Sequence, residues 1–146
     1  MYLRLIIFVC VCVLSTASSL AQATEIIIQA LDGKSGKSLP HQRLLIFGGE
    51  SADAPRFHDT SFEAITDEDG LAKLSFDLAK TSWIQVWVDF RSLCQTKPNL
   101  NSFSVQTILA SGVSSPNNCK SLAQTNVPGR FVVYSRSSSI GEKIGR

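Results

Sequence analysis

Two histidines are the side chains best suited to exchange a proton near neutral pH, and neither lies in a recognisable catalytic motif. His41 follows Pro40, and His58 stands beside Asp59. A catalytic carboxylate must meet the imidazole in space, whereas adjacent residues of a strand point to opposite faces. Serines are abundant, yet the chain contains no Gly-x-Ser-x-Gly string. We therefore predict a non-enzymatic protein without catalytic residues, and a small hydrolase that uses His41 or His58 is the alternative.

Two short strings resemble ligand-binding loops but lack essential positions. Gly36-Lys37-Ser38 matches the end of a phosphate loop, yet Leu31 stands where that loop needs its first glycine. Asp67-Glu68-Asp69-Gly70 lacks the third alternating ligand and the distal bidentate glutamate of a calcium loop. A turn explains the second string, because Asp and Gly satisfy local hydrogen bonds and positive φ. We predict no cofactor and no metal.

Both tryptophans of the chain lie in one alternating segment, residues 83–90. One face of this expected strand carries Ile84, Val86, Val88 and Phe90, and the other carries Trp83, Gln85, Trp87 and Asp89. The first face is predicted to enter the core. The second face, with its two tryptophans, either packs under a loop or forms an exposed aromatic patch. Trp83 and Trp87 are therefore the candidate ligand contacts.

Residues 1–23 have the order of a signal peptide. Arg4 supplies the only charge, an apolar run extends from Leu5 to Leu14, and small residues surround Ala21 and Ala23. About ten apolar residues fall short of the roughly 20 that cross a bilayer. We predict cleavage after Ala21 or Ala23 and a secreted or periplasmic chain without a membrane span, with an uncleaved anchor as the alternative.

Cleavage removes two of the four cysteines and leaves Cys94 and Cys119. In an oxidising compartment such a pair is expected to form a disulfide. Closing a loop of about 26 residues would stabilise the fold by roughly 3 to 4 kcal/mol on the chain-entropy model. A metal or redox pair is the alternative, but the long spacing and the absence of a neighbouring His or Cys disfavour it.

The composition describes one small globular domain. The 146 residues carry 14 Lys and Arg against 12 Asp and Glu, without a basic run of the kind that binds nucleic acid. With 44% hydrophobic and 18% charged residues, the chain is not generally disordered. We expect a β-sandwich domain over residues 24–136 and a flexible tail over residues 137–146.

Short β-branched or alternating runs, separated by turn residues, predict an antiparallel β-sandwich of about seven strands. The residues at 102–110 fit neither a strand nor a helix cleanly and are assigned to a strand. The segments 61–66 and 71–76, joined by 67–70, are expected to pair as a hairpin. The expected strands cover residues 24–31, 43–47, 61–66, 71–76, 83–90, 102–110 and 131–134.

Parts of the chain resemble transthyretin-like and carboxypeptidase-regulatory-like domains. The resemblance rests on residues 26–45, which include Ala30-Leu31-Asp32 and Gly36-Lys37-Ser38-Leu39-Pro40, and on Thr66-Asp67-Glu68-Asp69-Gly70 followed by an alternating strand. It extends to about Phe90, and the remainder is similar to small secreted bacterial proteins. The resemblance implies an all-β, antiparallel, seven-strand Greek-key sandwich.

One enzyme on this scaffold, 5-hydroxyisourate hydrolase, has signatures that this chain lacks. Gln29 stands where its catalytic histidine would precede Ala30-Leu31-Asp32, and residues 134–137 do not match its terminal Tyr-Arg-Gly-Ser. Glutamine cannot exchange a proton near neutral pH, so this activity is not expected.

These observations predict an exported binding or structural module of the cell envelope. Its partner would be an envelope protein or a carbohydrate, and nucleic acid is not expected. Besides the hydrolase, a second alternative is an edge strand that adds to a partner's sheet, with residues 131–134 as the candidate.

Overall fold

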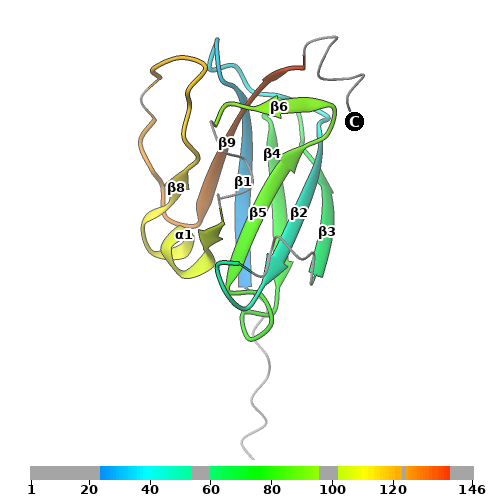
Figure 1. Cartoon of the computed structure of the whole chain (residues 1–146), viewed down its shortest axis with the longest axis vertical. Helices are drawn as coiled ribbons and strands as arrows, with labels where there is room; N and C mark the ends of the chain where they lie inside the picture. Colours follow the sequence, from blue (N-terminus) through cyan, green and yellow to red (C-terminus); the bar gives the residue numbers. More distant parts are fainter. Residues whose placement is uncertain (1–23, 54–59, 96–101, 123, 139–146) are drawn as a thin grey trace, which may run out of the picture.

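The computed structural model describes residues 24–53, 60–95, 102–122 and 124–138, which build two facing sheets and one short helix (Figure 1). The expected leader, His58 and residues 139–146 of the expected tail lie outside these ranges. No described helix has the length and apolar character needed to cross a membrane.

The first sheet has the order β4-β1-β9-β6, and β8 also pairs with β9, at residues 131–132. Its strands are β1 (Thr24–Asp32), β4 (Leu71–Phe76), β6 (Arg91–Leu93), β8 (Val113–Ser114) and β9 (Arg130–Ser137). The second sheet has the order β3-β2-β5-β7. Its strands are β2 (Arg43–Gly49), β3 (Thr60–Ile65), β5 (Trp83–Val88) and β7 (Phe103–Ser104).

The two sheets bury a common core between them, as the alternating sequence predicts. In β4, Ala72, Leu74 and Phe76 point inward while Lys73 and Ser75 are exposed. The largest fully buried side chains of this core are Ile26, Ile28, Leu44, Ile46, Ile84, Ile108 and Phe131. The predicted all-β, two-sheet arrangement is therefore confirmed.

The prediction of purely antiparallel strands is wrong for the first sheet. β1 runs parallel to β9 over six paired residues, and β8 also runs parallel to β9. Parallel neighbours require a long crossover connection. Here the chain supplies one between β1 and β9 by passing through the second sheet and α1, a long-range event that strand periodicity does not reveal.

The predicted hairpin of residues 61–66 and 71–76 is also wrong, because β3 pairs with β2 and β4 pairs with β1. The chain changes sheets at Thr66, which is buried. The Thr66 hydroxyl donates to the Leu39 carbonyl at 2.6 Å and accepts from the Gln42 N–H at 2.9 Å. These contacts hold Thr66 against the preceding loop, and the turn at Asp67 then carries the chain across the sandwich.

The predicted strand over residues 102–110 is mostly the helix α1 (Val105–Ser111), preceded by the two-residue strand β7. The Ser104 side chain caps the helix by accepting from the Thr107 N–H, and Gly112 ends it with a φ of 71°. Val105 and Ile108, three residues apart, are both buried. A capping serine, this spacing and a terminal glycine are helix signals that the apolar pattern alone had obscured.

A disulfide joins Cys94 and Cys119, as predicted. It ties the segment after β8 to the outward side of the first sheet. Leu31, Val132 and Tyr134, each at most 2% exposed, point away from the main core and pack with Cys94 and Cys119 into a second small core. Burial also raises the pKa of the Tyr134 hydroxyl. We call this surface the covered face.

Candidate functional site

The outward side of the second sheet carries large apolar side chains where water would favour polar ones. Leu45 and Phe47 of β2 lie there, and Leu45 is directly paired with Trp87 of β5. Trp83 occupies the same side of β5. All four are partly exposed rather than buried. We call the surface formed by Leu45, Phe47, Trp83 and Trp87 the tryptophan face.

Both predicted ligand-contact residues thus lie on one face of one strand. They are four positions apart, which is about 14 Å along an extended strand. Gln85 between them is only 4% exposed, so the surface of β5 is dominated by the two indoles. The structure therefore places Trp83 and Trp87 on the same side of β5, where both are partly exposed.

Phe90, which was expected to enter the core with Val88, instead projects into solvent and is 78% exposed. β5 ends at Val88, and Phe90 adopts a φ of 56° in the turn to β6. A left-handed backbone is unusual for a bulky residue. Its amide donates to the Asp89 carboxylate at 3.0 Å, and its carbonyl accepts from the Ser138 hydroxyl at 3.2 Å. These hydrogen bonds stabilise the turn from which the Phe90 ring projects into solvent.

The Phe90 turn borders a groove of about 450 Å³. The groove lies at the end of the sandwich where β9 finishes, and Figure 1 shows β6 at that same end. We call it the end groove. Its wall includes His41, Arg43, Asp89, Phe90, Arg91 and Ser138. Aromatic, charged and hydroxyl groups therefore meet there, a mixture typical of polar ligand sites.

Arg43 connects the end groove to the tryptophan face. Its guanidinium donates to both oxygens of Glu63, at 2.6 and 3.1 Å, and lies 3.5 Å from a carboxylate oxygen of Asp89. The hydrogen bonds and negative charge of Glu63 raise the pKa of Arg43 above its ordinary value. The positive charge is thus paired on two sides while the group stays half exposed.

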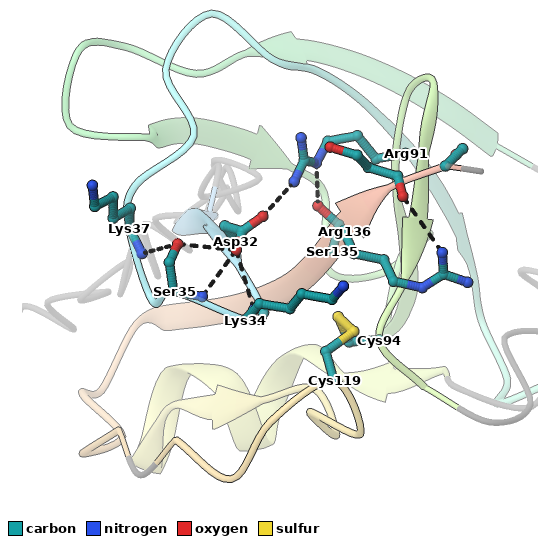
Figure 2. A network of polar contacts seen from close by, with 12 residues as sticks. Asp32, Lys34, Ser35, Lys37, Arg91, Cys94, Cys119, Ser135 and Arg136 are labelled. Atoms are coloured by element: carbon teal, nitrogen blue, oxygen red, sulfur yellow. Dashed lines mark hydrogen bonds and ion pairs between the residues drawn. A yellow bond between two sulfur atoms is a disulfide. The ribbon is translucent and has the colours of Figure 1, made fainter. Parts of the chain in front are cut away.

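Arg91 is fixed on the far side of the groove by a network that joins β1, β6 and β9 (Figure 2). Its guanidinium donates to the Asp32 carboxylate at 2.8 Å and to the Ser135 hydroxyl at 2.9 Å. Burial acts to raise the pKa of Asp32, but hydrogen bonds from Ser35 and Lys34 and the charge of Arg91 outweigh it and lower that pKa. Asp32 therefore stays ionised and holds Arg91 in place.

His41, one of the two histidines considered as a catalytic base, also lies on the groove wall. Its φ is 54°, and its Nε2 lies 3.2 Å from a carboxylate oxygen of Glu68. Both side chains of this pair are well exposed. A carboxylate so open to water cannot fix an imidazole as the buried aspartate of a catalytic triad does.

The turn that resembles a calcium loop forms local hydrogen bonds. The Asp67 carboxylate accepts from the N–H groups of Asp69 and Leu71, both at 2.9 Å. Among the described residues, no group of three His, Cys, Asp or Glu side chains is placed to hold a metal ion. Gln29, at the position of the hydrolase histidine, accepts a long hydrogen bond of 3.5 Å from Arg130.

The expectation that residues 131–134 form a sheet edge is wrong. β9 lies between β1 on one side and β6 and β8 on the other. Phe131, Val132, Val133 and Tyr134 are all buried, which is typical of a strand covered on both faces. In the described part of the chain, β3 and β4 each end a sheet instead.

Sequence reasoning missed the end groove because its residues come from three segments that lie far apart in the sequence. Arg43 begins β2, Phe90 and Arg91 follow β5, and Ser138 follows β9. The local sequence indicated the groove only through Asp89-Phe90-Arg91, in which two opposite charges flank an aromatic residue. Comparisons with models of known protein families and with characterised proteins find no match to this chain.

Proposed function

We propose that this chain is an exported, non-enzymatic module that binds an envelope polysaccharide through the tryptophan face. The supporting observation is that Trp83 and Trp87 lie partly exposed on the same side of β5, in one surface with Leu45 and Phe47. The predicted leader and the disulfide both suit an oxidising compartment outside the cytoplasm.

The chemistry of this face favours a carbohydrate over a charged polymer. Indole rings offer flat apolar surfaces with negative faces, on which the C–H groups of a sugar ring can pack. The charged residues at the border, Arg43, Glu63 and Asp89, already pair with one another. Two rings about 14 Å apart along a strand would contact successive parts of an extended chain.

For the fold, we propose the Greek-key arrangement of transthyretin-like domains. It is supported by the position of β4, which returns to lie beside β1 while β2 and β3 pair in the other sheet. This proposal concerns architecture alone, because one scaffold can host many functions.

Retention of the mature chain on immobilised hydroxyethylcellulose, xylan and glycol chitin tests the function. We expect retention on at least one of them, and its loss when Trp83→Ala or Trp87→Ala is introduced without unfolding. Val127→Thr is the matched control, since Val127 is another exposed apolar residue, 41% accessible, outside the tryptophan face. Failure of the native chain to bind any of the three, or equal retention of all variants, would contradict the proposal.

A further inference from the structure

We infer that the end groove is a second binding site, which takes one uncharged sugar unit at the end of the polysaccharide held by the tryptophan face. This inference rests on the proposed function and specifies its ligand further. Its basis is the groove's donors and acceptors, its exposed aromatic ring, its backbone conformation and its position next to the tryptophan face.

Charge pairing in the groove selects against an anionic ligand. The Arg43 guanidinium faces Glu63 and Asp89, and Arg91 lies 2.8 Å from Asp32. An incoming carboxylate or phosphate would meet these acidic groups beside every guanidinium. A neutral ligand avoids this repulsion and can still use the polar atoms of the wall.

The same wall suits hydroxyl groups, which both donate and accept hydrogen bonds. Guanidinium groups of Arg43 and Arg91 are donors, the Asp89 carboxylate is an acceptor, and the Ser138 hydroxyl, which donates to the Phe90 carbonyl, can accept. The Phe90 ring, 78% exposed at the border, adds an apolar surface for one side of a sugar ring. Polar groups around one exposed ring match the amphipathic shape of a single saccharide unit.

Backbone conformation singles out this region from the rest of the described chain. His41 and Phe90 are the two non-glycine residues there with positive φ, at 54° and 56°, and both line the groove. Left-handed backbone at bulky residues is unfavourable and collects at functional sites. Phe90 keeps this left-handed conformation although its ring packs into no core. Contact of the ring with a ligand would account for the conformation.

The groove continues the tryptophan face in register. Leu45 pairs with Trp87, and two residues further along each strand the Asp89 amide donates to the Arg43 carbonyl. Side chains two apart share one side of a strand. A chain lying across Trp83 and Trp87 therefore reaches the Arg43 and Asp89 pair and then the Phe90 ring.

The test measures binding of hexasaccharides by titration calorimetry. The uncharged probes are β-1,4-linked hexamers of glucose, xylose and N-acetylglucosamine, and the charged probes are hexagalacturonate and a glucosamine hexamer. We expect an uncharged hexamer to bind best, and Phe90→Gly to weaken it about tenfold. Because glycine tolerates positive φ, the same variant should unfold at a higher temperature than the native chain.

A gain in thermal stability with a loss of affinity is an outcome that mere misfolding cannot produce. Ile65→Thr is the control, since Ile65 is 68% exposed but does not line the groove, and it should leave affinity unchanged. Unchanged affinity in Phe90→Gly, or preference for either charged hexamer, overturns the inference. If the tryptophan variants lose polysaccharide retention while Phe90→Gly binds normally, the groove assignment fails and the proposed function stands. If the native chain binds no polysaccharide and no hexamer, both fail.

Discussion

The covered face and the tryptophan face are the outward sides of the two sheets, and both carry large apolar side chains. On the covered face, Val132 and Tyr134 are 2% exposed beneath the segment that the disulfide ties down. On the tryptophan face, Trp83 and Trp87 remain partly exposed. The comparison teaches that similar apolar alternation can lead to different burial: the disulfide-tied segment buries Val132 and Tyr134, whereas Trp83 and Trp87 stay partly exposed.

Loss of the disulfide is the change expected to affect the covered face most. The Cys94→Ser, Cys119→Ser double variant should lose about 3 to 4 kcal/mol of unfolding free energy, because the unfolded chain is no longer constrained by a loop of about 26 residues. Urea unfolding of the native and double-variant chains, each with and without reductant, measures this. Native chain with reductant should match the double variant, and equal stability of all four samples would show that the tether is not needed.

Gly33→Ala tests how tightly the covered face is packed. A Cβ at residue 33 would overlap the Cys94 sulfur and would lie 2.9 Å from the Asn117 side-chain oxygen. Such overpacking should cost about 2 kcal/mol. Urea unfolding should be measured for Gly33→Ala both in the native chain and in the Cys94→Ser, Cys119→Ser double variant. The loss of unfolding free energy should be smaller in the double variant, because serine is smaller than cysteine and the segment is no longer tied down. A penalty that is the same in both would place its origin elsewhere.

Matched threonine substitutions compare the two faces directly. Val132→Thr would bury a hydroxyl in the second small core and should cost about 1.5 kcal/mol. Leu45→Thr on the tryptophan face can expose its hydroxyl and should cost less, about 0.5 kcal/mol. Thermal and urea unfolding of both variants measure the difference. Equal losses would mean that the tryptophan face is as fully packed as the covered face.

The contribution of Asp32 to stability depends on pH. Its folded pKa lies below the ordinary value of 3.8, so at low pH the unfolded chain binds the proton more readily. The stabilisation is complete above that value and is lost as pH falls through the lower folded pKa. Asp32→Asn should cost about 1 kcal/mol at neutral pH and flatten the dependence between pH 5 and 2, about the range where carboxylates titrate. Urea unfolding of the native chain and of Asp32→Asn across this pH range measures the dependence. If the unfolding free energy of both proteins fell in parallel with pH, Asp32 would not be the source of the pH dependence.

Local sequence patterns were sufficient to predict the features of the fold that depend on residues close together in the sequence. The alternation in β4 placed Ala72, Leu74 and Phe76 correctly, and the cysteine count predicted the Cys94–Cys119 disulfide. The predictions that were wrong concern features that depend on contacts between residues far apart in the sequence. The sheet change at Thr66 requires Leu39 and Gln42, and the parallel neighbour of β9 is set by the whole path of the chain.

The candidate site likewise has a part that local sequence predicted and a part that it did not. Period-two alternation placed Trp83 and Trp87 on one side of a strand, which the structure confirms. It also assigned Phe90 to the core, because periodicity cannot tell where a strand ends in a left-handed turn. The end groove is assembled from three distant segments and has no counterpart in any local stretch of sequence.

Tryptophan fluorescence tests the central claim most directly, since Trp83 and Trp87 are the only tryptophans in the chain. The mature protein is titrated with the polysaccharide that retains it, and acrylamide quenching is measured with and without that polymer. We predict a saturable change in emission and weaker quenching in the complex, because the sugar covers both indoles. Binding that leaves emission and quenching unchanged would contradict the account and place the ligand on another surface.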